Sequence, residues 1–330
     1  MDASPLFSPL YADNETAQEG LLHLLRGDCP GSSPLSVYGL SGTRWTLADL
    51  RLATHEQLHL GSLPGMSQLL HRLHISLKRA RNYLHSPDAY YVDKLHTIRF
   101  HVLSIPALER VVFLFEDELS FYRQPSLAYA YEWMGRSQPL ARLGLKSNFV
   151  WRVAGLLDAW SGQVLYEQGS QINIAKLVKL YQQAVTAYPE AHTRFIAEDN
   201  WPVHAHPDVL AALQPQAFPH GLYRPSHWPT EPSPKAKRLN LPIRILFLPT
   251  YAPWTNPIEK LWKFVHQEVL HLHRFEDDWP GLKQAVMSCL DQFALGSQEL
   301  LQYVGLSDPC RLYRALPLLE LPPPVTILNS

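Results

Sequence analysis

The sequence predicts an α/β protein in which a layered domain built on a β-sheet follows a small helical domain. Two patterns lead to this prediction. Apolar runs of strand length alternate with amphipathic helical segments between residues 110 and 275, and only helical periodicity precedes them. The 330 residues are enough for one large domain or two modest ones, and the 46% share of hydrophobic residues is ordinary for a globular protein.

The N-terminal part of the chain carries helical patterns only. Residues 1–40 are weakly patterned and rich in Pro, Gly and Ser near their end. Within residues 41–87, "WTLADLRLATHEQLHL" begins with Thr46 and Asp49, spaced as in a capping box, and "LPGMSQLLHRLHI" follows as a second amphipathic helix. A dense basic cluster comes next, at Lys78, Arg79 and Arg81.

Two short helices followed by a basic segment suit a helix-turn-helix or winged-helix domain that binds DNA. The spacing suits a plain helical hairpin with a solvated, charged end equally well. Both interpretations stay open on the pattern alone, and in the first of them the basic cluster supplies candidate phosphate contacts.

A connecting helix is predicted over residues 88–108, after which the pattern changes to strands. "RVVFLFEDE" has the apolar run of a buried strand that ends in acids, and "NFVWRVAGLLD" and "GQVLYE" are two more strands joined by the turn "DAWSG". An amphipathic helix follows over residues 173–188, and "TRFIAEDN" and "IRILFLP" are the fourth and fifth strands. A helix that opens at Pro257 completes this domain, for which we expect the boundaries 109–275.

Residues 214–240 are predicted to be a Pro-rich insertion in this domain. They contain six prolines and show no periodicity, so the segment is either a functional or a disordered loop. Residues 276–330 are expected to form a helical C-terminal tail. The insertion also carries candidate phosphate contacts, at Lys235, Lys237 and Arg238.

Charge and cysteine content restrict the cellular setting. The formal net charge of −1 gives the whole molecule no polyanion-binding signature, although a local basic face is compatible with it. The N-terminus lacks the basic start and apolar run of a secretion signal, and the apolar runs are too short to cross a bilayer. We therefore expect a soluble, cytoplasmic protein without membrane contacts. The cysteines are expected to be free thiols in a reducing compartment: Cys29, Cys289 and Cys310.

Acidic residues follow the predicted strands. Asp117 comes at the end of the first strand and Asp199 at the end of the fourth. Parallel neighbouring strands lie about 4.8 Å apart, so their carboxyl ends would bring both acids to one edge, where open α/β sheets bind ligands. Glu259 lies on the first turn of the helix after the fifth strand. Clustered carboxylates repel one another unless a cation neutralises them, and oxygen-rich acidic sites suit magnesium or manganese.

Helix capping and turn formation explain the same residues without any chemistry. Asn256 suits an N-cap, Pro257 the first helical position, and Glu259 the third position of a capping box. Asp199 and Asn200 suit a turn. Only the convergence of three acids favours a site. The neighbouring acids point the other way on an ideal strand and are interpreted as bystanders: Glu116, Glu118 and Glu198.

Three motifs in this order resemble one known family. "FEDE" after an apolar strand, "EDNWPVH" and "LPTYAPWTNPIEKLW" are similar to segments of the bacterial insertion-sequence transposases of the IS six-thirty type, relatives of the mariner transposases in the DDE superfamily. The resemblance covers about residues 45–275, and its most specific part is the run P-x-Y-x-P-x-x-N-P-I-E-x-x-W. It implies a ribonuclease-H-like mixed five-stranded sheet with flanking helices, preceded by a helix-turn-helix domain.

Carried over position by position, Asp117, Asp199 and Glu259 match the family's catalytic acids, which hold magnesium or manganese, two ions in all. The implied activity is cleavage of DNA at transposon ends and joining of the 3′-hydroxyl to target DNA. His204 matches the histidine of the family's "DN…H" pattern, where it orients the acid or contacts DNA. The implied partners are inverted-repeat ends and target DNA, bound by a homodimer at the nucleoid. Two further residues are expected to support the site, Asn200 and Asn256.

The sequence departs from the family pattern in two places. The second and third acids lie 60 residues apart (259 − 199), longer than is usual in these relatives, and the Pro-rich insertion accounts for the excess. Residues 1–44 do not resemble the first of the two helix-turn-helix units that a full-length relative carries. Two alternatives therefore stay open: a catalytically idle or truncated remnant that only binds DNA, and a related DNA endonuclease that cleaves without joining.

Overall fold

The structure is a computed structural model of the whole chain. It forms two compact units, Met1–Tyr83 and Leu84–Ser330, where the sequence placed a domain boundary after residue 87. Each unit is described by itself. The described residues are 46–58, 62–75, 86–107, 110–132, 134 and 138–313.

The described part of the first unit contains two helices, α2 (Leu47–Leu58) and α3 (Leu63–Arg72). The predicted capping box is formed at the start of α2, where Asp49 Oδ2 accepts a hydrogen bond from Thr46 N at 3.0 Å and Thr46 Oγ1 accepts one from Asp49 N at 3.2 Å. The basic cluster expected to contact DNA from this unit lies outside the described residues: Lys78, Arg79 and Arg81.

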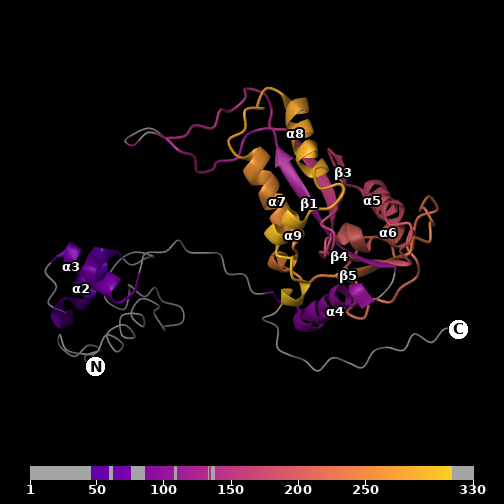
Figure 1. Cartoon of the computed structure of the whole chain (residues 1–330), viewed down its shortest axis with the longest axis horizontal. Coiled ribbons are helices and arrows are strands. Elements are labelled where there is room, and N and C mark those ends of the chain that lie inside the picture. Colours follow the sequence, from indigo (N-terminus) through magenta and orange to yellow (C-terminus); the bar gives the residue numbers. More distant parts are fainter. Residues whose placement is uncertain are drawn as a thin grey trace. The chain divides into compact units, whose positions relative to one another are not determined.

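The second unit is built on one mixed five-stranded sheet, as predicted (Figure 1). Its strands follow the order β3-β2-β1-β4-β5. Strands β1, β2 and β3 pair antiparallel as a meander, whereas β4 and β5 run parallel to β1. The strand bounds are β1 Val111–Tyr122, β2 Val150–Asp158, β3 Val164–Gly169, β4 Thr193–Glu198 and β5 Ile243–Phe247.

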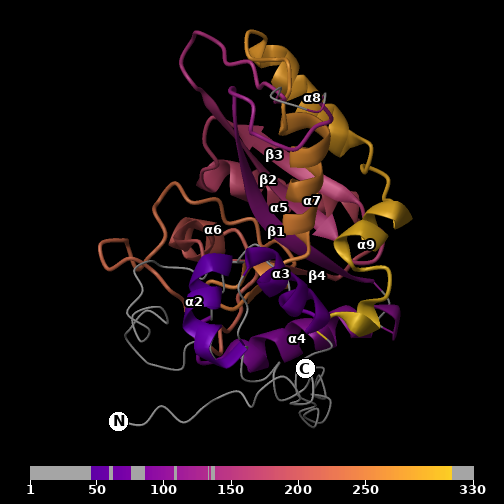
Figure 2. The same ribbon diagram turned by 90° about the vertical axis from the view of Figure 1, so that its left-hand side faces the viewer.

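Helices cover both faces of this sheet and give it two hydrophobic cores (Figures 1 and 2). One face carries α4 (Tyr91–Ser104), α7 (Ile258–Val265), α8 (Trp279–Asp291) and α9 (Gln298–Val304). The opposite face carries α5 (Ile174–Ala187) and the short α6 (Pro207–Leu210). Short helical turns connect these elements: η2 Ile105–Ala107, η3 Pro202–Ala205, η4 Pro253–Thr255, the π-helical η5 His266–Leu270, and η6 Pro309–Arg311.

The two faces follow from the period of two along each strand. On β1, Phe113 and Phe115 pack into the core beneath α7, while Leu114 packs into the core beneath α5. On β4, Ile196 and Ala197 divide between the same two cores. Any polar side chain at the end of these strands is therefore assigned to a face by the parity of its residue number.

The segment 276–330, expected to be a tail, contains α8 and α9. Their apolar side chains belong to the core of the second unit rather than to a separate element, because Leu282, Val286 and Leu290 are fully buried beside α7. Packing of these helices thus completes the face of the sheet that carries α7.

The Pro-rich insertion 214–240 is a loop without helix or strand, and hydrogen bonds attach its first residues to β5. Gln216 Oε1 accepts a hydrogen bond from Ile245 N at 2.9 Å, and Arg244 Nη1 donates to Pro215 O at 2.7 Å. Farther along, both carboxylate oxygens of Asp208 accept bonds from Ser233. The hydrogen bonds favour an ordered loop over a disordered one.

The structure also describes two of the cysteines and the lengths of the helices. Among the described residues, Cys289 and Cys310 are free thiols. Cys29 lies outside the described residues. No helix in the described part of the chain combines the length and the apolar character needed to cross a membrane.

Candidate active site

Asp117 lies inside β1 and not at its end, so that part of the prediction was wrong. β1 continues to Tyr122 because β2 pairs antiparallel along it as far as the couple Tyr122↔Val150. The parallel neighbour β4 stops earlier, at Glu198, and its last pair with β1 is Phe115↔Ala197. Continuing this register by two residues places Asp117 beside Asp199, so the expected proximity of these two acids holds for a different reason.

Helix α7 supplies the immediate surroundings of Asp117. Trp262 Nε1 donates a hydrogen bond to Asp117 Oδ2 at 3.0 Å. The indole ring lies over Gly155, the residue opposite Asp117 on β2, and a Cβ at Gly155 would lie 2.6 Å from the ring atom Cη2. Burial, and then the negative charges of Glu259 and Glu118, raise the pKa of Asp117 to about 8.

Glu259 lies on the first turn of α7 and lines the same cavity as Asp117, and the capping box considered for it is not formed. Pro257 occupies the N-cap position without a side-chain hydrogen bond, because Asn256 turns its amide toward β1 and donates from Nδ2 to Glu116 O at 2.7 Å. Burial and the charge of Asp199 raise the pKa of Glu259. The Glu259 carboxylate therefore does not cap α7, although the sequence pattern allowed that role.

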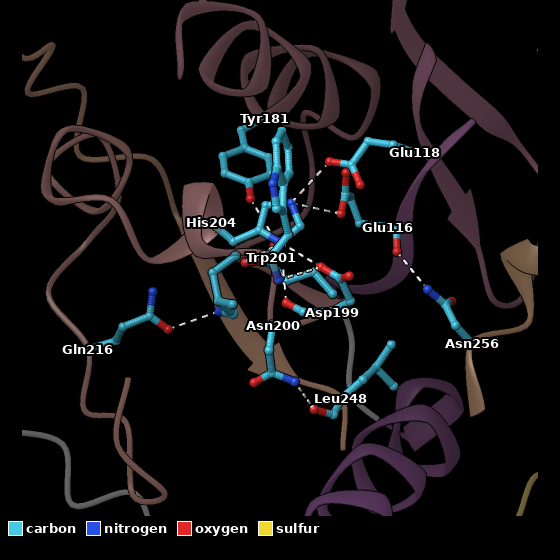
Figure 3. A network of polar contacts seen from close by, with 12 residues as sticks. Glu116, Glu118, Tyr181, Asp199, Asn200, Trp201, His204, Gln216, Leu248 and Asn256 are labelled. Carbon is cyan, nitrogen blue, oxygen red and sulfur yellow. Dashed lines mark hydrogen bonds and ion pairs between the residues drawn. The ribbon is translucent and has the colours of Figure 1, made fainter. Parts of the chain in front are cut away.

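Asp199 follows β4 directly and also forms the predicted turn, since its Oδ1 accepts a hydrogen bond from Trp201 N at 2.7 Å. Burial opposes ionisation of Asp199, but the hydrogen bond and positive charge of His204 lower its pKa overall. The neighbouring Asn200 donates from Nδ2 to Leu248 O at 2.7 Å and so ties the ends of β4 and β5 together (Figure 3).

All three predicted acids line one cavity of about 1010 Å³. Asp117 reaches it from β1, Asp199 from the end of β4, and Glu259 from the start of α7. Tyr223 of the Pro-rich insertion also lines it, and Arg152 of β2 is the one lysine or arginine among the described lining residues. Two predicted supporting residues share this lining, Asn200 and Asn256. The insertion's basic residues are exposed and lie outside the lining: Lys235, Lys237 and Arg238.

The donor chemistry of the cavity fits a divalent cation. Four carboxylates line one space, those of the three predicted acids and of Glu118, so the prediction that Glu118 is a bystander was wrong. Mutual repulsion contributes to the raised pKa of Asp117 and of Glu259. Within the described residues, no lysine or arginine forms an ion pair with any of the three acids. Asn256 Oδ1 is buried there without a hydrogen-bond partner. Hard oxygen donors of this kind suit magnesium or manganese.

The sequence reasoning overlooked a buried cluster on the opposite face of the same strands (Figure 3). Glu116 and Glu198 point away from the cavity, as the strand period predicts, but they are not bystanders. Both are fully buried around His204, which is itself fully buried, so the option that this histidine contacts DNA is not supported. The sequence signal for this cluster was the run of consecutive acids in "FEDE" and "AED". Successive residues of a strand point to opposite faces of the sheet, so one of two neighbouring acids must lie beneath α5.

Charge is concentrated in this cluster. His204 Nε2 lies 3.2 Å from Glu116 Oε2 and 3.3 Å from Glu118 Oε1. Burial lowers the pKa of His204, but the carboxylates of Glu198 and Glu116 outweigh it and raise that pKa overall. Burial raises the pKa of Glu116, and it raises the pKa of Glu198 to about 7. Tyr181, which lies on α5, donates a hydrogen bond from Oη to Glu198 Oε2 at 2.6 Å.

Asp88 fixes the loop that follows β5. Its Oδ2 accepts hydrogen bonds from Lys94 Nζ at 2.7 Å and from Thr250 N at 2.9 Å, and Thr250 lines the cavity. Burial opposes ionisation, but Lys94 and the two backbone donors, Thr250 and Tyr90, lower the pKa of Asp88 overall.

We expect Asp88→Asn to lower the free energy of unfolding by about 1–2 kcal/mol at pH 7, because it removes a buried, charge-assisted acceptor. A folded-state pKa below the unfolded value of about 3.9 means that the stabilisation is complete above that value and is lost as pH falls through the folded pKa. Urea denaturation at pH 7 and at pH 3 measures the difference. A gap between wild type and variant that widens toward low pH would contradict this assignment.

Comparison with known proteins identifies the family of this chain and its fold. The family model described as DDE superfamily endonuclease matches residues 112–279. The "Insertion element IS630 uncharacterized 39 kDa protein" of Shigella sonnei is 24% identical over 251 residues, which cover 75% of this chain and 64% of that protein.

Two solved structures share the fold. One is a Mos1 transposase paired-end complex with the left transposon end, with a TM-score of 0.53 and 18% identity over 94% of this chain and 88% of that one. The other is a Mos1 mariner paired-end complex with Mn, with a TM-score of 0.53 and 18% identity over 92% of each chain. The ribonuclease-H-like fold predicted from the motifs is therefore confirmed. Because the family model matches more than half of its residues, this chain belongs to the DDE superfamily of endonucleases.

Proposed function

We propose that this protein is a transposase that cuts DNA at transposon ends and joins the freed 3′-hydroxyl to target DNA. The observation that carries the proposal is the meeting of Asp117, Asp199 and Glu259 in one cavity, although they come from three elements spread over more than 140 residues of the chain. Membership of an endonuclease superfamily supports DNA cleavage, and the similar insertion-element protein supports transposition.

In this proposal the three acids hold two magnesium or manganese ions. Ions so held supply Lewis-acid activation of the attacking oxygen and stabilise the leaving oxygen in phosphoryl transfer. The protein's own residues place the ligands: Trp262 orients the Asp117 carboxylate, the Trp201 amide holds Asp199, and the bond from Asn200 to Leu248 keeps the ends of β4 and β5 together. Arg152 faces the same cavity and suits a phosphate oxygen of the bound strand.

The test is a cleavage and joining assay on DNA that carries the inverted repeats flanking the gene, with and without Mg²⁺ or Mn²⁺. The proposal expects metal-dependent nicking at the repeat ends followed by products joined to target DNA. Cleavage without joined products would instead support an endonuclease without strand transfer. Binding to the repeats with no cleavage under any divalent ion would support an idle or truncated remnant.

The exposed basic residues of the insertion are proposed phosphate contacts. We expect Lys235→Ala, Lys237→Ala and Arg238→Ala together to lower the slope of log K against log salt by about 2–3, because each lost phosphate contact removes about 0.9. Fluorescence anisotropy on end DNA over a range of salt concentrations gives the slope. A matched control removes three cations that the structure pairs with acids, Arg110, Lys179 and Arg311. An equal loss of slope in both variants would show that only net charge matters.

A homodimer on DNA is proposed, with the segment 123–149 between β1 and β2 as its contact; we name this segment the β1–β2 arm. The base of the arm is fastened, since Gln124 and Gly144 exchange two hydrogen bonds of 2.9 Å. The arm exposes large apolar side chains, Tyr129 at 98%, Tyr131 at 107% and Leu145 at 103%. Such exposed groups on a fastened segment support burial against another protein surface, here a second copy of the chain.

We expect Tyr129→Ser, Tyr131→Ser and Leu145→Ser together to shift the protein from dimer to monomer, because the apolar area buried at the contact is lost. Light scattering coupled to size-exclusion chromatography, with and without end DNA, measures the mass. Leu295→Ser is the matched control, since Leu295 is 98% exposed outside the arm. A dimer that survives the triple substitution would remove the arm from the interface.

A further inference from the structure

A second group of metal-ligand types lies beneath the proposed catalytic acids, on the α5 face of the sheet (Figure 3). Glu116 and Glu198 are neighbours there, because they continue the β1–β4 register by one residue beyond Phe115↔Ala197. Each is 0% exposed, and so is His204, which η3 places between them. One ligand atom from each of these three residues lies within 4.8 Å of the others.

This group is rich in buried polar atoms that lack partners. Both carboxylate oxygens of Glu116, Oε1 of Glu198 and Nε2 of His204 have no hydrogen-bond partner among the described residues. Glu118 adds one more such oxygen, Oε1, at the same place. Buried polar atoms in native proteins are satisfied by a hydrogen bond, by water or by an ion, and unpaired buried charge is costly. Three carboxyl groups and a single imidazole meet at this place.

The hydrogen bonds around this group fix which atoms face its centre. His204 Nδ1 lies 3.2 Å from the carbonyl oxygen of Asp199, which can only accept, so Nδ1 carries a ring proton. Nδ1 also lies 3.3 Å from Asp199 Oδ1 and 3.9 Å from Glu198 Oε1. Nε2 faces Glu116 and Glu118, and it can bind a cation once its own proton has been released. Tyr181 donates to Oε2 of Glu198 at 2.6 Å, which leaves Oε1 of that carboxylate free. Outer hydrogen bonds of this kind commonly orient metal ligands.

The spacing also fits an ion. His204 Nε2 lies 3.2 Å from Glu116 Oε2 and 3.3 Å from Glu118 Oε1. Ligands bound tetrahedrally at about 2.0–2.1 Å stand about 3.3 Å from one another. These separations suit an ion pair while Nε2 carries a proton, and they suit ligands of one shared cation after that proton has been released.

We propose that Glu116, Glu198 and His204, with Glu118 beside them, bind one buried divalent cation of the first transition row, Zn²⁺ or Mn²⁺. The imidazole ligand and the complete burial disfavour Mg²⁺, which prefers oxygen ligands and retains several waters. This site lies on the face of the sheet opposite the three acids, although Glu118 also lines their cavity, and its evidence does not depend on the proposed transposase activity. It would join β1, β4 and η3 directly behind Asp117 and Asp199 and so hold their backbones in place.

The test measures metal content in the full-length protein with the cavity ligands removed by Asp117→Asn and Glu259→Gln. After loading with ZnCl₂ or MnCl₂ and dialysis against a chelator-treated buffer, elemental analysis should find about one ion per chain, and MgCl₂ should leave none. At a hundredfold excess of free ion over Kd, Tm should rise by about 5–10 °C. Adding Glu116→Gln and His204→Gln should abolish both the bound ion and the rise in Tm.

A matched control alters another buried acid and another buried histidine, Glu276→Gln and His273→Gln, and should keep the ion. Metal content and Tm of the unsubstituted protein are measured alongside, so the result stands even where a variant does not fold. Failure to retain Zn²⁺ or Mn²⁺ in the unsubstituted protein, with Tm unmoved by either salt, overturns the buried site. That outcome leaves the transposase proposal intact, because DNA cleavage is scored separately on the unsubstituted protein.

Discussion

Asp199→Asn is expected to lower the rate of Mg²⁺-dependent cleavage at transposon ends by at least about 10³-fold. The substitution removes one negative oxygen from a metal-binding set, and metal stabilisation of transition-state charge is worth several kcal/mol, about 1.4 for each factor of ten. Asn keeps the shape of the side chain and can still accept the 2.7 Å bond from Trp201 N, so the fold should survive. Single-turnover cleavage of end DNA, with circular dichroism on the same samples, measures both properties.

Asp277→Asn is the matched control, because this exposed acid pairs with Arg142 away from the cavity. Its cleavage rate should stay within about twofold of the wild type. Wild-type rates in Asp199→Asn would remove this residue from the catalytic set. DNA binding should persist in the variant, and its loss would show that the substitution acts through the fold instead.

Trp262→Ala has the largest expected effect on stability, a loss of about 3–5 kcal/mol in the free energy of unfolding. The ring is 4% exposed, packs into the core beneath α7 and occupies the space left by Gly155 on β2. Its removal also frees the Asp117 carboxylate from the 3.0 Å bond that orients it, so cleavage should fall as well. Chemical denaturation monitored by circular dichroism gives the stability change.

Two further variants separate packing from orientation at this position. Trp262→Phe keeps most of the buried area but removes Nε1, so its stability loss should be smaller while cleavage falls by about 10- to 100-fold, as for other outer-sphere partners. Trp254→Ala is the control for losing an indole, because Trp254 is 54% exposed, and it should cost about 1 kcal/mol or less. Unchanged cleavage in Trp262→Phe would argue against an orienting role.

Much of the fold could be predicted from local patterns. The five strands and the amphipathic α5 follow from hydrophobic period, and the start of α2 from the pair Thr46 and Asp49. These signals are local, since each depends on residues that are near one another in sequence. The length of β1 could not be predicted in this way, because it depends on pairing with β2, which begins 28 residues after β1 ends (150 − 122).

The site shows the same division between local and tertiary information. The motif around Glu259 suited a capping box with Asn256 as the N-cap. In the structure Asn256 Nδ2 instead donates a 2.7 Å hydrogen bond to Glu116 O on β1, a partner 140 residues away. The buried group around His204 was missed for a similar reason. Strand period alone placed Glu116 and Glu198 away from the cavity, but it gave no sign that a histidine and a tyrosine from other elements would meet them there.

The sequence by itself determined the order of strands and helices, the family, and which acids to examine, because those properties reside in short runs of residues. Only the tertiary structure decided that Asp117, Asp199 and Glu259 line one cavity and that a second, fully buried group lies behind two of them. The physical reason is the register of β1 against β4. One residue of shift would exchange the two faces, sending the cavity acids beneath α5 and the buried acids into the cavity.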